Sequence, residues 1–198
     1  MIQHAPGILL SPSSEWQKIS ASADKAGNFL YVILLAVLPA VAWYHGTTEH
    51  GWTVGSGETT LLTADSATKL IVLFYAAMVV SIAVIGYFIH WMAESYGAKS
   101  SLMRGITVAG YTATPMFIAG AVGFFPILWL SLVLAIVSVS WSLYLLYAGI
   151  PIVMNVPKER GFLFASAVVA ICLVILIAIM CASVILWDMG FAPEYRNH

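Results

Sequence analysis

The sequence predicts an all-α integral membrane protein with five transmembrane helices in a bundle, and two observations support this prediction. The first is composition: of 198 residues, 61% are hydrophobic and 9% are charged, with a mean hydropathy of +0.94. In a soluble domain about 25% of the residues are charged. The second is pattern, because the chain contains five apolar runs, each near the ~20 residues that cross a bilayer as a helix. An ordinary soluble domain is excluded.

Two of the five runs, residues 105–125 and 127–149, lie back to back and contain no Lys, Arg, Asp, Glu or His. Pro126 joins them through a connection so short that the two helices must be antiparallel neighbours. Pro115 falls inside the first run, where a proline removes one backbone hydrogen bond. Lipid offers the freed carbonyl no hydrogen-bond partner, so hydroxyl groups of the protein are expected to seal the break by donating hydrogen bonds to it. The candidates are Tyr111, Thr112, Thr114, Ser138, Ser140 and Ser142.

The other three spans are predicted at residues 27–44, 69–93 and 162–187. Before the first of them, Ser11 followed by Pro12 is typical of a helix start. Trp16 and Ile19 share one face of that helix, which predicts a short amphipathic helix at residues 12–19 lying on the membrane surface. An irregular polar tail is the alternative.

The distribution of basic residues predicts the orientation. Five spans place the termini on opposite sides, and the side of the N-terminus then carries six of the eight Lys and Arg residues. Under the positive-inside rule the N-terminus is cytoplasmic and the C-terminus is outside. The six residues are Lys18, Lys25, Lys99, Arg104, Lys158 and Arg160, against Lys69 and Arg196 on the other side.

Candidate chemical sites are few. His45, Glu49 and His50 have side chains of the kind that bind zinc or copper, but the His-x4-His spacing does not put both rings on one helical face. His90, the one candidate proton carrier in a span, is better explained as an interfacial residue beside Trp91. Nucleophile, base and acid are not grouped in one membrane layer, and no glycine loop suits a phosphate. We therefore expect no enzyme activity, cofactor or metal.

Charge distribution and the spacing of small residues predict the partners of the protein. No basic patch suggests nucleic acid, and apolar helices imply the lipid bilayer. Small residues at four-residue spacing let helices approach closely, either within one chain or between a chain and a protein partner or second copy. These pairs are Ala119 and Gly123, Ser138 and Ser142, Ser166 and Ala170, and Ala178 and Ala182.

Several motifs together resemble the Yip family of small five-span membrane proteins. The central match reads Tyr111-x-Ala113-Thr114-Pro115, then Pro126, then Tyr144-x-x-Tyr147-x-Gly149-Ile150-Pro151, followed by Asn155 and Lys158. Two outlying motifs, Gly46-Thr47-Thr48 with Gly51-Trp52 and Lys158-Glu159-x-Gly161-Phe162, resemble its bacterial inner-membrane branch in particular.

The resemblance implies one membrane domain over residues 1–198, a cytoplasmic N-terminus, a periplasmic C-terminus and a place in the bacterial inner membrane. The motif residues are then family and structural positions. Eukaryotic relatives act in vesicle traffic with Rab GTPases through long N-terminal regions, whereas about 26 residues precede the first span here. The resulting hypothesis is a non-catalytic membrane scaffold, partner-binding or membrane-organising protein. The alternative is a small-molecule facilitator or channel with a site at the Pro115 kink.

Overall fold

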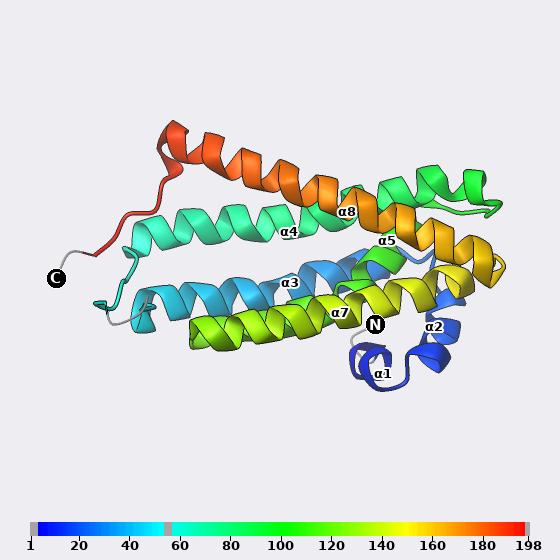
Figure 1. Ribbon diagram of the computed structural model, residues 1–198, viewed down its shortest axis with the longest axis horizontal. Helices are drawn as coiled ribbons and strands as arrows, with labels where there is room; N and C mark the ends of the chain where they lie inside the picture. Colours follow the sequence, from blue (N-terminus) through cyan, green and yellow to red (C-terminus); the bar gives the residue numbers. More distant parts are fainter. Residues whose placement is uncertain (1–3, 54–56, 197–198) are drawn as a thin grey trace.

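The computed structural model describes residues 4–53 and 57–196 and, over these residues, consists of helices without a β-strand (Figure 1). Four helices are long and apolar enough to cross a membrane. They are α3 (Gly27–His45, continued by a π-helical turn, Gly46–His50), α4 (Ala64–Ala93), α7 (Leu128–Val153) and α8 (Lys158–Leu186).

A fifth candidate span is a broken helix. It combines α5 (Leu102–Thr112) with α6 (Thr114–Ala119) and a 3₁₀ turn, Gly120–Phe124, and the two parts are bent by 42°. The predicted all-helical membrane fold is therefore confirmed, with four candidate spans, or five if the bent pair counts as one.

Polar caps make the helices longer than the predicted apolar runs. The side chain of Thr63 accepts a hydrogen bond from the backbone N–H of Ser66, so α4 begins at Ala64. The side chain of Ser101 does the same for the N–H of Arg104 at the start of α5. Short side-chain acceptors of this kind stabilise helix starts. A 3₁₀ turn, Glu94–Tyr96, follows α4, and a π-helical turn, Trp187–Phe191, follows α8.

Helix α7 extends beyond the predicted range of 127–149, through Pro151 to Val153. Pro151 lies in the last turn, where it removes one backbone hydrogen bond and its ring presses against the carbonyl group four residues earlier. In return, Val153 and Met154 become fully buried against the rest of the bundle. Burial of two large apolar side chains stabilises the extra turn by more than the lost hydrogen bond costs.

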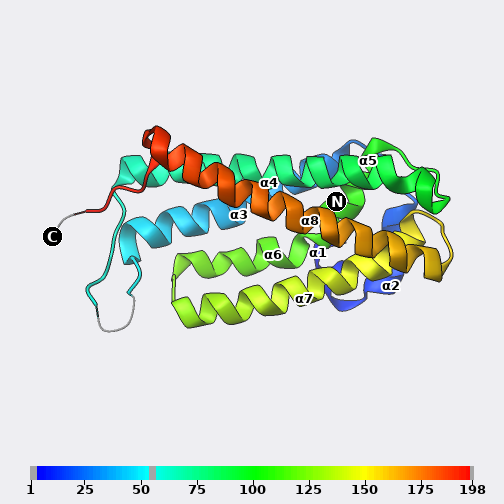
Figure 2. The ribbon, with the colours of Figure 1, turned by 45° about the horizontal axis from the view of Figure 1, so that its top comes forward.

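The bent pair reaches from one end of the bundle to the other. At one end the guanidinium of Arg104 donates to the carbonyl oxygen of Val153 (3.0 Å) and pairs with Asp24 (2.7 Å), so α5 starts where α7 ends. At the other end Gly46 and Gly123 touch through their backbones, since a Cβ on Gly46 would meet the Gly123 carbonyl. Figure 2 shows α6 running alongside α7.

The N-terminal segment is a helical hairpin that packs on the bundle. It comprises α1 (His4–Leu10) and α2 (Pro12–Ser20), and it lies beneath the last turns of α7 in Figure 1. The predicted helix is present, and its apolar face packs on the bundle, because Trp16 and Ile19 are 0% and 1% exposed. The reason is Gly149 on α7, which leaves room for the indole of Trp16.

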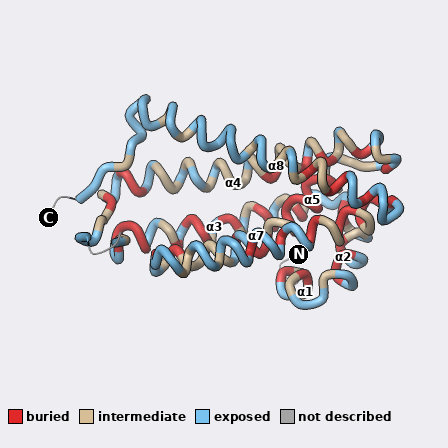
Figure 3. The backbone as a smooth tube through the Cα atoms, in the orientation of Figure 1, coloured by how far each residue is buried: buried red, intermediate tan, exposed pale blue. Residues whose placement is uncertain are grey.

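Burial is concentrated at the end of the bundle that carries the N-terminal hairpin (Figure 3). Phe164, Ala165 and Val168 in the first half of α8 are buried there, whereas most residues after Cys172 on the same helix are exposed. In a membrane, lipid covers such apolar side chains. The bundle is therefore packed tightly at one end and more open at the other.

Candidate functional site

The break between α5 and α6 is the centre of the candidate site. Ala113 occupies the break itself, and Pro115 lies in the first turn of α6, where its missing N–H is least costly. Thr114 is fully buried, and its hydroxyl is hydrogen-bonded to the hydroxyl of Tyr31 on α3 at 2.8 Å. The same Thr114 hydroxyl approaches the Gly110 carbonyl oxygen at 3.5 Å. A hydroxyl pair from two helices therefore lies at the break.

Among the described residues, none of the three predicted serines on α7 hydrogen-bonds at this break, which corrects the expectation that they seal it; the buried Ser142 hydroxyl has no hydrogen-bond partner. Ser138 donates to the carbonyl of Ala135 at 3.0 Å, and Ser140 donates to that of Ile136 at 2.8 Å, both within α7. A carbonyl one turn back on the same helix is the nearest acceptor for a serine hydroxyl. Sequence reasoning missed Tyr31, because nothing local connects the first span to the break.

Aromatic rings fill the space beside the break. Tyr111 stacks on Tyr31 with ring centroids 4.5 Å apart and an interplanar angle of 20°. From the N-terminal hairpin, His4 and Trp16 meet the Tyr111 ring edge-on at 6.0 and 6.4 Å. Within the described part of the chain, the Tyr111 hydroxyl and the Trp16 Nε1 are buried without a hydrogen-bond partner.

A buried carboxylate lies next to these rings. Glu15 is 6% exposed, and its oxygens contact His4 Nδ1 at 2.5 Å and Lys18 Nζ at 3.0 Å. The hydrogen bond from His4, followed by that from Lys18, holds the pKa of the Glu15 carboxyl below its ordinary value of 4.5. Gly7 faces Glu15 so closely that a Cβ there would lie 2.7 Å from the carboxyl group. Two neighbours and a glycine thus accommodate the charge.

His4 and Glu15 are site residues that sequence reasoning did not identify. Eleven residues separate them, and only the hairpin between α1 and α2 brings them together. A weak signal is present in the sequence, namely a histidine at the start of the apolar segment His4–Leu10. The position of Glu15 in the sequence is explained by the helix alone, since it lies in the first turn of α2 near the positive end of the helix dipole.

The motif residues of α7 have separate environments. Tyr144 is 49% exposed and packs on Trp141 at the surface, so it does not share a space with the buried Thr114. The Tyr147 hydroxyl is hydrogen-bonded to Ser166 on α8 at 2.9 Å. Gly149 lies against the Trp16 indole, where a Cβ would come within 2.5 Å of the ring.

The remaining motif residues are found at turns. Pro126 is buried in the connection after α6, and its ring lies close to Gly46. Asn155 has φ of 52°, a left-handed conformation that asparagine tolerates better than most residues. Pro151 lies against Gly161, where a Cβ would be 2.5 Å from the proline ring. Lys158 opens α8 as an exposed residue.

The candidate metal ligands lie at the opposite end. His45 ends α3, and Glu49 and His50 belong to the π-helical turn that continues it. The two imidazole rings are 5.3 Å apart. Across residues 4–53 and 57–196, no group of three or more His, Cys, Asp or Glu side chains is arranged to hold a metal ion.

Comparison with known proteins gives the family. Residues 7–179 match the Yip1 domain. The chain is 35% identical over 192 residues to the inner membrane protein YohC of Escherichia coli strain K12, covering 96% of this chain and 98% of the relative. The YohC protein of Escherichia coli O6:H1 matches equally well. No solved structure matches. With these matches and its long apolar helices, the chain belongs to the Yip1 family as a multi-pass protein of the bacterial inner membrane.

Proposed function

We propose that this Yip1-family protein is a non-catalytic scaffold that binds a protein partner or organises the membrane. The observation that supports it best is the filled space around Pro115. Thr114, Tyr111 and Phe117 are 0%, 1% and 6% exposed, and Pro115 itself is buried. A facilitator needs an accessible space at a broken helix, whereas side chains occupy this one.

The proposed topology has one membrane domain with five spans, a cytoplasmic N-terminus and a periplasmic C-terminus. The contacts at the two ends of the bent pair support five spans rather than a re-entrant loop. Arg104, at the start of α5, contacts Val153 at one end of the bundle. Gly123, after α6, contacts Gly46 at the other end, so α5 and α6 together run the length of α3. The motif residues are then proposed as structural positions that fix turns and helix contacts.

A facilitator with a site at the kink is the second candidate, and one observation favours it. The Tyr111 hydroxyl and the Thr112 hydroxyl lie near the break, buried and without a partner among the described residues. Buried polar groups normally have a hydrogen-bond partner, so a group without one is a candidate to bind a ligand or an ordered water. If the protein is a scaffold, ordered water molecules would be the hydrogen-bond partners of these two hydroxyls.

Reconstitution into vesicles tests the two candidates. We expect purified protein to cause no solute flux above that of empty vesicles across a panel of small metabolites. Flux that disappears in Tyr111→Phe or Thr114→Val, while Tyr144→Phe at the surface retains it, would replace the scaffold with the facilitator. In cells, changes at Gly149 or Pro151 should mainly reduce protein abundance. Normal abundance combined with a lost transport phenotype would contradict the scaffold proposal.

A further inference from the structure

A hollow of about 490 Å³ opens at the end of α4, where the helix turns into the polar connection before α5. Its polar lining comes from His90, Glu94, Lys99 and Ser100, and its floor includes Ala93 and Ala98. Pockets of ~300–1,000 Å³ are the usual size for small-molecule binding. This hollow is separate from the break at Pro115.

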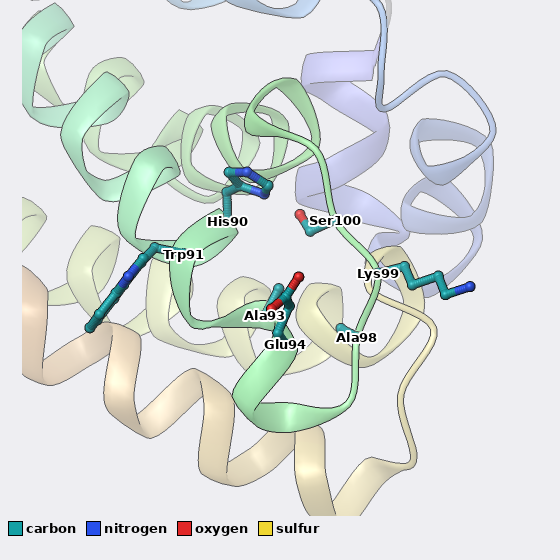
Figure 4. Close-up of a pocket in the computed structure, with 7 residues that line it drawn as sticks. All are labelled: His90, Trp91, Ala93, Glu94, Ala98, Lys99 and Ser100. Atoms are coloured by element: carbon teal, nitrogen blue, oxygen red, sulfur yellow. The ribbon is translucent and has the colours of Figure 1, made fainter.

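Two hydrogen-bond acceptors line the hollow, on the exposed Glu94 and the half-buried Ser100. Figure 4 shows the Glu94 carboxylate and the Ser100 hydroxyl facing each other across it. The Ser100 hydroxyl donates to the Ser101 carbonyl at 3.1 Å, which leaves its oxygen lone pairs available. Among the described residues, Glu94 forms no ion pair, and the buried Nδ1 of His90 has no hydrogen-bond partner. Such a lining suits a group that carries a positive charge and several N–H donors.

Basic side chains lie at the rim. Lys99 extends from the connecting loop away from the hollow in Figure 4. The guanidinium of Arg160 lies over Gly97, where a Cβ would be 2.7 Å from its Nη1. Gly97 is located between the lining residues Glu94 and Ala98 and has φ of 76°. Two cations therefore lie close to the acceptors Glu94 and Ser100.

The neighbouring surface is apolar and aromatic. Trp91, which also lines the hollow, is 65% exposed, and Tyr87, one turn earlier on α4, is 53% exposed. Exposed tryptophan and tyrosine at the end of a membrane span are typical of the level of the lipid headgroups. Acyl chains can follow this face of α4 while a headgroup enters the hollow.

We propose that this hollow binds a phosphoethanolamine headgroup, with the ammonium on Glu94 and Ser100 and the phosphate near Lys99 and Arg160. The ligand source is a phospholipid of the surrounding membrane rather than free phosphoethanolamine. Choline headgroups lack N–H donors for the two acceptors, and glycerol headgroups lack the positive charge. The site should therefore discriminate among phospholipids by their amine.

Lipid retention measured by native mass spectrometry tests the proposal. The intact protein is released from nanodiscs of equal parts phosphatidylethanolamine, phosphatidylcholine and phosphatidylglycerol. We expect preferential retention of phosphatidylethanolamine. Glu94→Gln should lower that preference by about three- to tenfold, the value of one charge-assisted hydrogen bond. Lys99→Gln combined with Arg160→Gln should lower retention of all three phospholipids, because each of them carries the phosphate.

The control is Glu159→Gln, which removes an exposed carboxylate at the same end of the bundle, and thermal melting of each variant checks its fold. Equal retention of the three lipids, or a preference that Glu94→Gln leaves unchanged, would overturn the proposal. Free phosphoethanolamine added in excess should not displace the lipid. If it does so at concentrations where it binds alone, the soluble headgroup is the ligand and the lipid assignment is wrong.

Discussion

Trp16 and Gly149 form a contact that only the smallest residue on α7 permits, because the indole lies where a Cβ would be. We expect Gly149→Val to displace Trp16 and to lower the free energy of unfolding by about 1–3 kcal/mol, a typical cost of overpacking. Thermal unfolding in detergent, followed by intrinsic fluorescence, measures the change. Ala135→Val, at an exposed position on the same helix, is the matched control and should be nearly neutral.

A double variant gives this prediction its sharpest form. In a Trp16→Ala background the steric conflict is absent, so Gly149→Val should cost much less than in the natural chain. Residues in direct contact show such non-additive effects, whereas distant residues do not. Equal costs in both backgrounds would mean that Trp16 and Gly149 do not meet.

Glu15 gives the N-terminal hairpin a dependence on pH. Its pKa in the folded protein is lowered from 4.5 by His4 and then Lys18, so its ionised form stabilises the fold above the ordinary pKa. That stabilisation is lost as pH falls through the lowered folded pKa. We expect the melting temperature of the natural chain to exceed that of Glu15→Gln from neutral pH to about pH 5, and the difference to shrink below pH 4.5.

Melting curves between pH 7 and pH 3 test this expectation. Glu159→Gln, an exposed change on α8, should show no such convergence. A constant difference between the natural chain and Glu15→Gln down to pH 3 would contradict the role of the Glu15 charge.

At the scale of elements, the Tyr31 and Thr114 hydroxyls connect α3 to the broken helix. We expect Tyr31→Phe and Thr114→Val each to destabilise the protein, and the double variant to cost less than the sum. The coupling should be about 0.6–2 kcal/mol, the range for hydrogen bonds between membrane helices. Unfolding by denaturant in mixed micelles measures it. The pair Tyr147→Phe and Thr114→Val joins no shared hydrogen bond and should be additive within about 0.5 kcal/mol.

The helices were predictable from sequence because their signals are local. Twenty apolar residues in succession suffice to predict a membrane helix, and Pro115 and Asn155 mark the break and the turn where they occur. The buried carboxylate was not predictable in this way. Glu15 is polar and follows a helix start, and the packing of α1 on α2, with His4 and Gly7 against the carboxyl group, removes it from water. Likewise, Tyr31 meets Thr114 across 83 residues of chain.

For the molecule as a whole, the two ends differ in packing and in charge. The end with the N-terminal hairpin holds most of the buried side chains and the ion pair between Arg104 and Asp24 (Figure 3). At the other end, α8 stands apart from α7 in Figure 1, and most of its residues there are exposed. Because lipid supplies contacts to the open end, we infer that the closed end sets the arrangement of the helices.

The proposed five-span topology makes a prediction about the whole chain. Single cysteines are placed at Glu58, Ile127, Lys99 and Lys158 after Cys172 and Cys181 are changed to alanine. We expect a membrane-impermeant maleimide applied to spheroplasts to label Glu58→Cys and Ile127→Cys without permeabilisation. The contact between Gly46 and Gly123 puts the loop after α3 and the connection before α7 at the same end of the bundle. Lys99→Cys and Lys158→Cys should react only after the membrane is permeabilised.

The residue that decides the number of spans is Ile127. If α5 and α6 formed a re-entrant loop, Ile127→Cys would react together with Lys99→Cys and not with Glu58→Cys. Four spans would then remain, and both termini would lie on one side of the membrane. With five spans, a reporter fused after His198 should behave as periplasmic, and one placed before Met1 as cytoplasmic. With five spans and a cytoplasmic N-terminus, residue 127 and the C-terminus both lie on the periplasmic side. We therefore expect the cysteine at Ile127 and the reporter at His198 to give the same result.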